Sequence, residues 1–486
     1  NLSVSVAASG GFEAVAASFT LPRTGKWYWE YRTGAGGSSI YGRPSLITVD
    51  EYMTQTSNAG ETSGGSAASN PNGVLFTAND GGKRINNSDT SFGSAVSAGD
   101  IIGNAYDADT GQWFIYINNS IQASGAAISE SIKGNLAGKD VYILHERYNG
   151  NGVDVYNFGQ NSTFAGATTA GGNQDDNGIG DFKYPVPSGY LALCTSNLPT
   201  PTIVDGSEYF NTVLWTGNGS DGRSITGVGF DPDFVWIKSR NLATSHLLND
   251  TIRGANKSLF SEADTAETAD NGGGYLSAFV TDGFSVTSGS SGDDAVNDSS
   301  DTYVSWNWKI NGGSTSNVSA GGSSNIRLIG GGTADQAAVQ VNTEAGISIV
   351  SFENTVRAAD GFCTFPHGLG SAPDMVWLKS RTSSNYWAIY HSALGLKLGF
   401  LGSSLGSNAF ISSTFWNAVS DSTVKFQSNG NLSATDEDII AYCFKSIEGY
   451  SKAGSFSGNN STNFVHTGFR VAWLIIKNAD EGTGAN

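Results

Sequence analysis

The sequence predicts an all-β protein made of several modules. Glycine supplies 64 of the 486 residues and charged residues only 14%, a composition that favours short strands joined by tight turns. Aromatic residues make up 11% of the chain, and many alternate with other residues over short segments, which is typical of strands with a buried face. For a chain of this length we expect about three or four domains.

The net charge and the cysteines indicate which ligands and which redox environment to expect. The net charge is −18, and a polyanion repels phosphate, so we expect no nucleic-acid partner. Cys194, Cys363 and Cys443 lie far apart and match neither a disulfide framework nor a CxxC metal site. We expect buried thiols, assembly in a reducing cytoplasm and no cofactor. No apolar run is long enough for a membrane span, and no signal peptide is visible.

Residues 1–165 are predicted to form the first β module. Residues 26–32 (KWYWEYR) place Trp27, Trp29 and Tyr31 on one face of a strand. Residues 112–117 (QWFIYI) predict a second strand followed by an Asn-Asn turn, and 153–158 a closing strand. Residues 54–73 are rich in Gly, Ser, Asn and Thr and predict a long exposed loop.

Three segments of this module, in order, resemble a known domain. They are GKWYWE at 25–30, GDIIGNAYDADTG at 99–111 with the strand that follows, and YNFGQ at 156–160. Together they are similar to the core of a SPRY domain. The resemblance implies a concanavalin-like β-sandwich that binds partners through loops at one end. No loop here matches a binder from which residues can be transferred.

Residues 166–211 are predicted to form an extended connector. The stretch 181–201 is rich in proline, which fixes φ and resists both helices and central strands. We expect a semi-rigid strap that lies against the first sandwich. A strap of this kind after a SPRY-like unit resembles proteins of tailed bacteriophages, especially marine ones.

The rest of the chain repeats itself. FVWIKSR at 234–240 recurs as MVWLKSR at 375–381, and in degraded form as WLIIK at 473–477. Gly229, Gly370 and Gly468 each stand nine positions before the shared lysine. WNWK at 306–309 matches YCFK at 442–445, so the first and last lysines of a repeat are 71 residues apart in one copy and 66 in the other.

These repeats predict tandem β-sandwich modules at 212–312 and 346–450. A Gly/Ser-rich linker is expected at 313–345, with one short strand near 325–329, and a helical turn within 247–259. Residues 455–486 predict the start of a third, truncated repeat. Because a module cut within its first strands cannot bury its own core, we expect that the natural polypeptide continues or that a partner chain completes it.

Acidic clusters are the first candidate sites. Asp107-x-Asp109-x-Gly111 resembles the start of a calcium loop, but the twelfth position is Asn118 instead of a bidentate Glu, so a hairpin turn is expected. Asp175-Asp176 lie on the connector, where a solvated loop is favoured over a metal site. Asp293-Asp294, Asp298, Asp301 and 436–438 (DED) precede strands and are expected to cap or solvate turns. No metal site is predicted.

No catalytic pattern is found. The five histidines are His145, His246, His367, His391 and His466, and none is spaced for HExxH. No P-loop motif is found, and the single matches to GxGxxG at 217–222 and to GxSxG at 402–406 carry little weight in a chain so rich in Gly and Ser. No carboxylate pair has the flanking pattern expected of a glycosidase, although sequence leaves such a pair open. For sugar stacking, aromatics on predicted loops are the candidates. They are Tyr41, Tyr52, Tyr148, Trp387, Tyr390 and Trp416.

These observations favour a structural, non-enzymatic virion protein of a tailed phage. We expect a tail fibre or other surface appendage that presents repeated β modules for host attachment and receptor binding, where weak sites gain strength through multivalency. Expected partners are other virion proteins, further copies of the chain (a homotrimer by family analogy) and a host-surface glycan or protein. The alternatives are a capsid-decorating head fibre and a carbohydrate-active depolymerase or lectin.

Overall fold

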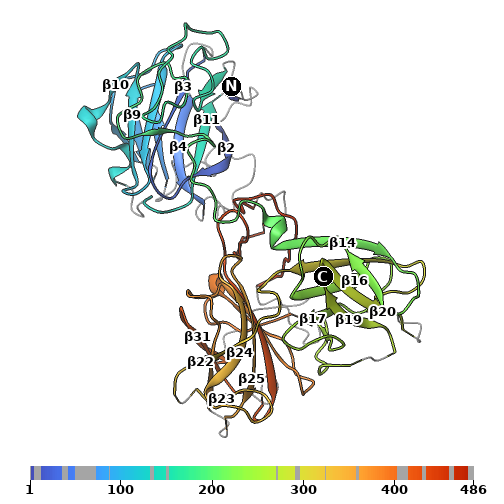
Figure 1. Cartoon of the computed structure of the whole chain (residues 1–486). Coiled ribbons are helices and arrows are strands. Elements are labelled where there is room, and N and C mark those ends of the chain that lie inside the picture. The colour runs from blue at the N-terminus through green and yellow to red at the C-terminus, as the bar shows by residue number, and fades with distance from the viewer. Residues whose placement is uncertain are drawn as a thin grey trace. The chain divides into compact units, whose positions relative to one another are not determined.

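The computed structural model describes residues 2–4, 12–34, 42–49, 73–86, 88–131, 136–148, 153–269, 272–289, 296–322, 324–356, 361–401, 414–428, 434–458 and 465–479. They form two compact units (Figure 1). The first unit comprises residues 1–200 with 456–468, and the second comprises 201–455 with 469–486. The predicted all-β class is confirmed, and among the described residues no helix is long and apolar enough to cross a membrane.

The first unit is a sandwich of two antiparallel sheets. In spatial order, one sheet contains β1 (Leu2–Val4), β12 (Asp154–Asn157), β3 (Lys26–Arg32), β8 (Ile101–Asp107), β9 (Gln112–Ile117) and β10 (Ser120–Ile121), and β13 (Leu191–Ala192) pairs with β3. The other contains β2 (Phe12–Leu21), β11 (Val141–Tyr148), β4 (Gly42–Thr48), β5 (Gly73–Thr77), β6 (Gly82–Ile85) and β7 (Ser88–Ser91). The predicted sandwich and its strands at 26–32 and 112–117 are therefore confirmed.

Alternation along the strands builds the core of this sandwich. Trp27, Trp29 and Tyr31 of β3 point to one face and pack with Leu46 of β4 and Phe76 of β5 from the opposite sheet. All five are buried, as expected for alternate residues on a strand that faces a second sheet. Except for Gly73, which begins β5, the predicted loop at 54–73 lies outside the described residues.

The proline-rich strap lies against the outer face of the first sheet, as predicted. Strand β13 pairs in parallel with β3, and Phe182 packs on Tyr28 with ring centroids 5.1 Å apart. The buried carboxylate of Glu30 accepts hydrogen bonds from the backbone N–H groups of Lys183 (2.9 Å) and Tyr184 (3.0 Å). Burial raises the pKa of Glu30, although these bonds oppose the rise.

The second unit contains two repeats, each with a large and a small sheet. The large sheet of the first repeat has the order β14 (Phe210–Thr216), β21 (Thr302–Trp308), β16 (Phe234–Ser239), β17 (Leu247–Asp250) and β18 (Leu259–Phe260). Its small sheet has the order β15 (Arg223–Thr226), β20 (Gly283–Thr287) and β19 (Tyr275–Val280). Of the segment 247–259, where the sequence predicts a helical turn, Leu247–Asp250 pairs with β16 as a strand, and a single turn follows it, closed by the hydrogen bond from the Gly254 N–H to the Asp250 carbonyl at 3.0 Å.

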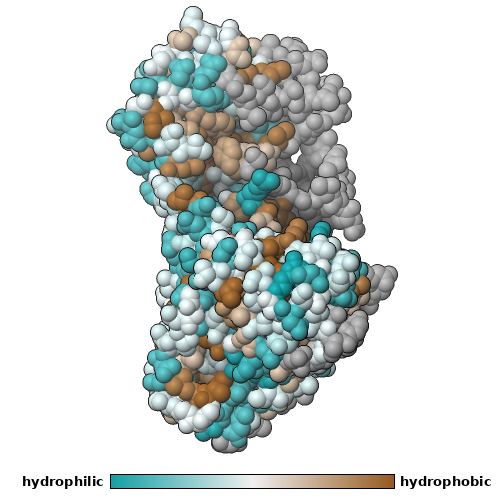
Figure 2. Space-filling model, turned by 45° about the vertical axis from the view of Figure 1, so that its right-hand side comes forward, coloured by the Kyte–Doolittle hydropathy of each residue, from teal (hydrophilic) through white to brown (hydrophobic). Residues whose placement is uncertain are grey.

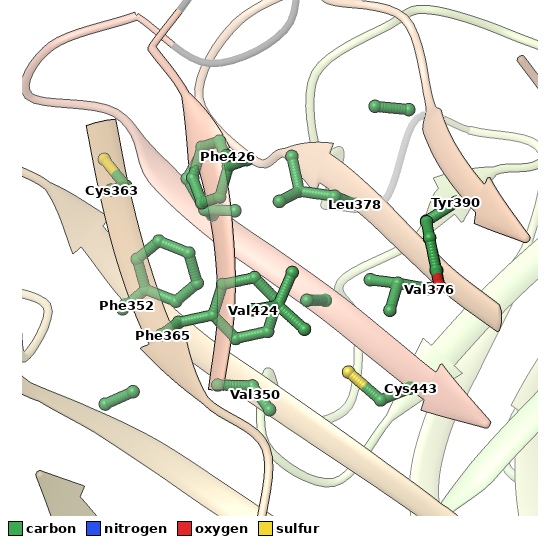
Figure 3. Close-up of a cluster of buried hydrophobic side chains, with 14 of the residues drawn as sticks. Val350, Phe352, Cys363, Phe365, Val376, Leu378, Tyr390, Val424, Phe426 and Cys443 are labelled. Atoms are coloured by element: carbon green, nitrogen blue, oxygen red, sulfur yellow. The ribbon is translucent and has the colours of Figure 1, made fainter. Parts of the chain in front are cut away.

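The second repeat has the same plan with extra strands. Its large sheet has the order β22 (Ser316–Ser319), β24 (Gln336–Asn342), β25 (Ile347–Asn354), β32 (Asp438–Phe444), β27 (Met375–Ser380), β28 (Ala388–His391) and β29 (Gly399–Phe400), with β23 (Ile326–Arg327) paired to β25. Its small sheet has the order β26 (Phe362–Pro366), β31 (Thr423–Gln427) and β30 (Trp416–Val419). Figure 3 shows the core between these sheets, including Phe352, Phe365 and Phe426.

One boundary predicted from sequence needs correction. Residues 313–345 are not a linker, because β22, β23 and β24 within them complete the large sheet of the second repeat. In the segment 455–486, predicted to begin a third, truncated repeat, the described residues contain no strand. The left-handed glycine of the repeat is nevertheless present in all three copies, with φ of 89° at Gly229, 73° at Gly370 and 88° at Gly468.

The two repeats are not independent modules, because they share a hydrophobic core. In β16, Val235 and Ile237 face the small sheet of their own repeat, whereas Phe234 and Trp236 face the other repeat. Strand β27 divides in the same way, with Trp377 on the shared side. The second unit therefore has four layers, with the two large sheets back to back in the middle. On the face drawn in Figure 2, apolar side chains reach the surface only in separate patches among neutral and hydrophilic ones.

Candidate functional site

Of the six aromatics predicted to lie on binding loops, the structure describes the side chains of three, and all three are buried. Tyr41 and Tyr52 lie outside the described residues, and Tyr148 ends strand β11, with its side chain also outside them. Trp387, Tyr390 and Trp416 are only 2%, 8% and 1% exposed. The expected exposure of all three is therefore wrong. Trp387 lies on a loop as predicted but packs in the shared core, whereas Tyr390 lies in β28 and Trp416 begins β30, both in the core of the second repeat.

The indole groups of the two buried tryptophans are already bonded. Trp387 Nε1 donates to the carbonyl oxygen of Phe260 in the first repeat at 2.8 Å, and Trp416 Nε1 donates to that of Ile389 at 3.0 Å. Burying an indole in this way is favourable because its one donor finds a partner. These residues hold the fold and present no face to a sugar.

An aromatic layer joins the two repeats of the second unit. The repeat-equivalent Trp236 and Trp377 meet edge to face, with centroids 5.9 Å apart. Phe234 lies 4.7 Å from Tyr442 of the other repeat, and Trp377 lies 4.8 Å from Phe444. Such pairs add about 0.5–1.5 kcal/mol each beyond the apolar area they bury, so the layer is a strong junction.

Charged side chains clasp the two repeats beside this layer. Arg253 of the first repeat has no exposed side-chain surface; its Nε donates to Asp250 Oδ2 at 2.6 Å and one Nη to the hydroxyl of Tyr442 at 3.1 Å. Tyr442 in turn donates to Asp250 Oδ2 at 2.6 Å. Arg381 of the second repeat forms a two-pronged pair with Glu267 of the first, at 2.9 and 3.0 Å. We call Asp250, Arg253, Glu267, Arg381 and Tyr442 the clasp.

The clasp fixes the charge state of Arg253 and Tyr442. Burial alone lowers the pKa of Arg253, but Asp250, Tyr442 and Glu267 reverse this and hold it above its ordinary value. Burial raises the pKa of Tyr442 well above its ordinary value. Arg253 is therefore a cation and Tyr442 a neutral donor at any physiological pH. Sequence reasoning missed the clasp, because its partners are far apart and carry no motif.

The repeated lysine has a structural role in both copies. Lys238 Nζ donates to the carbonyls of Ser239 (2.7 Å) and Leu242 (2.8 Å), and Lys379 Nζ to those of Ser380 (2.8 Å) and Ser383 (3.2 Å). Each lysine thus holds the turn after its strand. Burial lowers the pKa of both amines, that of Lys379 to about 8.

One margin of the aromatic layer is partly exposed and mixes aromatic with polar groups. Trp306 pairs across the strands with Trp236, whose Nε1 donates to His246 Nδ1 at 2.9 Å. Glu262 accepts from the backbone N–H of His246, and Trp473 lies 6.5 Å from Trp306 between centroids. We call Trp306, His246, Glu262 and Trp473 the aromatic margin. Flat rings beside hydrogen-bonding groups suit a sugar or a peptide.

The acidic clusters predicted from sequence close turns. Asp107 accepts from the backbone N–H groups of Asp109 (3.1 Å) and Thr110 (3.2 Å), which confirms the hairpin turn between β8 and β9. Asp175 is buried and accepts from the N–H groups of Ala192 and Ile179 within the strap, so it is not solvated as expected. Within the described residues, no group of three or more metal-ligating side chains comes together. Asp293 and Asp294 lie outside those residues.

The five histidines lie apart in the fold. In the first unit, buried His145 bonds Asp154 Oδ2 at 2.7 Å and the Tyr156 hydroxyl at 2.8 Å. His466 packs edge to face on Tyr142, 5.4 Å between centroids. In the second repeat, His367 contacts the carbonyl of Ser420, and His391 caps a short 3-10 helix (Ser392–Leu394). All of these contacts are compatible with structural roles.

Comparisons with known proteins bear on each unit. Similar solved structures include a human SPRY domain (17% identity, TM-score 0.25), which covers 32% of this chain and 89% of that chain. The SPRY domain of human HERC1 has 13% identity and a TM-score of 0.22, covering 30% and 83%. Stonustoxin has 18% identity and a TM-score of 0.21, covering 29% and 20%. A search of curated proteins found no match.

The second unit gives the family. The sequence profile of a family described as "Domain of unknown function (DUF7483)" matches residues 205–485. This range includes both repeats, β22 to β24 and the segment with Trp473, in agreement with the shared core. The match extends over more than half of the sequence, and the chain therefore belongs to the DUF7483 family.

Proposed function

We propose that this chain is a structural, non-catalytic protein of a tailed-bacteriophage particle, in a tail fibre or another surface appendage. The observation that carries the proposal is the fusion of the two repeats into one block through the aromatic layer and the clasp. A rigid block suits a protein that must hold a receptor-binding module away from a particle surface. The SPRY-like sandwich with its strap would be that module.

The use of ionisable groups supports this assignment over an enzymatic one. Asp233 of the first repeat accepts the backbone N–H groups of Ile310, Asn311, Gly312 and Gly313, and its equivalent Asp374 accepts that of Ser446. The repeated lysines bind carbonyls, and Asp250 and Glu267 bind arginines. Groups engaged in this way are poor candidates for acid–base catalysis, which needs a group within reach of a substrate.

Particle composition tests the proposal directly. Mass spectrometry of purified virions is expected to detect this polypeptide, and immunogold electron microscopy is expected to place it on tail appendages. Label on the capsid would favour the alternative of a head fibre. Absence of the polypeptide from virions that carry its gene would contradict both assignments.

Glycan binding is a second candidate function, favoured by the aromatic margin. Trp306 and Trp473 are partly exposed beside His246 and Glu262, a combination that suits stacking on a sugar and hydrogen bonding to its hydroxyls. A Trp306→Ala variant is expected to lose retention on host envelope glycans, whereas Leu396→Ala, at a distant exposed apolar position, keeps it. Release of reducing sugar from those glycans by the wild-type chain would instead identify a depolymerase.

A further inference from the structure

Strand β14 leaves one edge of its sheet open. It is the terminal strand of the five-stranded sheet, and pairs only with β21 among the described strands. The ladder continues beyond both ends of β14 through Lys309 N–H to Tyr209 O and Gly217 N–H to Asp301 O. Odd-numbered residues of β14 therefore bond β21, and the N–H and C=O groups of residues 210, 212, 214 and 216 point to the open edge.

Two of the polar backbone groups on this edge already have hydrogen-bond partners. The N–H of Thr212 is bonded by Asn211 Oδ1, and the carbonyl of Thr216 by Arg223. Leu214 lies between them, and its side chain is 58% exposed. An open edge with an exposed apolar residue at its centre is a template for another strand.

The second repeat shows which element pairs with the equivalent edge of its own large sheet. Strand β25 occupies the place of β14, since it pairs with the closing strand β32 as β14 pairs with β21. The edge of β25 that corresponds to the open edge of β14 is filled by β24, in the register Gln340 opposite Ile349. Repeat symmetry therefore predicts a strand beside β14, where the described part of the chain has none.

The same chain carries a strand-forming segment that lacks a sheet. Residues 471–477 (VAWLIIK) include, at 473–477, the third copy of the sequence that forms β16 and β27, which are central strands in their sheets. In the part of the chain that the structure describes, no backbone hydrogen bond joins these residues to another segment. Leu474 and Ile476, whose equivalents Val235 and Ile237 are buried, are 63% and 67% exposed.

Residues 471–477 are suited to the open edge. Their apolar run has the pattern of a strand buried on both faces, and β14 has a core on each side, with Trp215 in one and Phe210 at the other.

Within one copy the segment does not occupy this edge. Trp473 lies on the face of the sheet, with centroids 5.2 Å from Trp308, 6.0 Å from Trp236 and 6.2 Å from Phe210. A segment that lies over three strands on the face cannot at the same time continue the plane of the sheet. We propose that residues 471–477 of one copy of this chain add as a β strand to the open edge of β14 in a second copy.

Sedimentation velocity of the full chain over a range of concentrations tests the proposal. We expect the wild type to associate, and Leu474→Asp/Ile476→Asp and Leu214→Pro each to remain monomeric. Proline at 214 removes an N–H that faces the open edge and leaves the ladder with β21 intact, so the variant should fold. Leu396→Asp, at a 44% exposed apolar site elsewhere in the second unit, is the matched control and should associate. A wild type that is monomeric throughout would overturn the proposal.

Mixed crosslinking separates exchange between copies from pairing within one copy. Both partners carry Cys194→Ser, which removes the partly exposed native thiol, since Cys363 and Cys443 are buried. One partner then carries Leu214→Cys and the other Leu474→Cys. A disulfide dimer is expected from the mixture at higher yield than from either partner alone. A third variant carries Leu214→Cys and Leu474→Cys in the same chain. If this variant forms only an intramolecular disulfide, and the mixture forms none, the segment pairs within its own chain and the proposal fails.

Discussion

The two repeats of the second unit share a strand plan but differ in how their ends are finished. In the second repeat, β22 and β24 extend the sheet beyond β25, whereas in the first repeat β14 is the last strand. Position twelve after the repeated lysine is Asp250 in one copy, bonded to Arg253, and His391 in the other, a helix cap. The common lysines thus hold turns and the common tryptophans Trp236 and Trp377 join the repeats, whereas position twelve joins the repeats in one copy and caps a helix in the other.

Breaking the clasp is the strongest test of that junction. Arg253→Met removes the partner of the buried Asp250 carboxylate, and we expect a loss of about 3–5 kcal/mol in the free energy of unfolding. Urea denaturation measures it. Asp250→Asn with Arg253→Met leaves no unpaired charge, so the double variant should be more stable than the sum of the single losses predicts. Additive losses would show that the two side chains do not act as a pair.

The aromatic layer gives the next comparison. Trp236→Ala and Trp377→Ala each remove a buried ring from the same junction, and each should cost about 3–5 kcal/mol, lower in that range for Trp236, which is slightly more exposed. Because the rings touch each other, the double variant should lose less than the sum. Thermal unfolding should remain a single transition for the second unit. Separate transitions for the two repeats would refute the shared core.

Repeat-equivalent aspartates differ in their number of partners. Asp233 accepts hydrogen bonds from four backbone N–H groups and the Thr251 hydroxyl, whereas Asp374 accepts them from one backbone N–H and the Ser392 hydroxyl. Asp233→Ala should therefore destabilise by roughly 3 kcal/mol and Asp374→Ala by about half of that. Chemical denaturation of both variants measures the difference, and equal losses would contradict it.

The repeated lysines predict the smallest effect, a pH dependence. Burial lowers the pKa of Lys379 from 10.5 to about 8, so between these values the unfolded chain binds more protons than the folded chain. The contribution of Lys379 to stability therefore rises as pH increases from about 8 to 10.5. The unfolding free energy of wild type minus that of Lys379→Met should increase over this range. For Lys238→Met, at a more exposed amine, the increase should be smaller, and a flat difference for Lys379 would be inconsistent with a buried amine.

Local sequence was sufficient for much of the fold. Alternation located β3 and β9, and repetition located β16 and β27, with a shared glycine that has a positive φ in all three copies. Proline content indicated the strap, and the carboxylate spacing at 107–111 indicated a turn. These features depend on residues close together in the chain, whose conformations are limited by the backbone and by one buried face.

Only the tertiary structure decided which faces meet. Trp387, Tyr390 and Trp416 resemble loop aromatics in sequence and are buried because strands from distant segments cover them. The Gly/Ser-rich segment 313–345 forms strands because β25 offers an edge, and Tyr442 meets Asp250 and Arg253 because two large sheets lie back to back. Such contacts depend on long-range burial, which is non-directional and leaves no local pattern in the sequence.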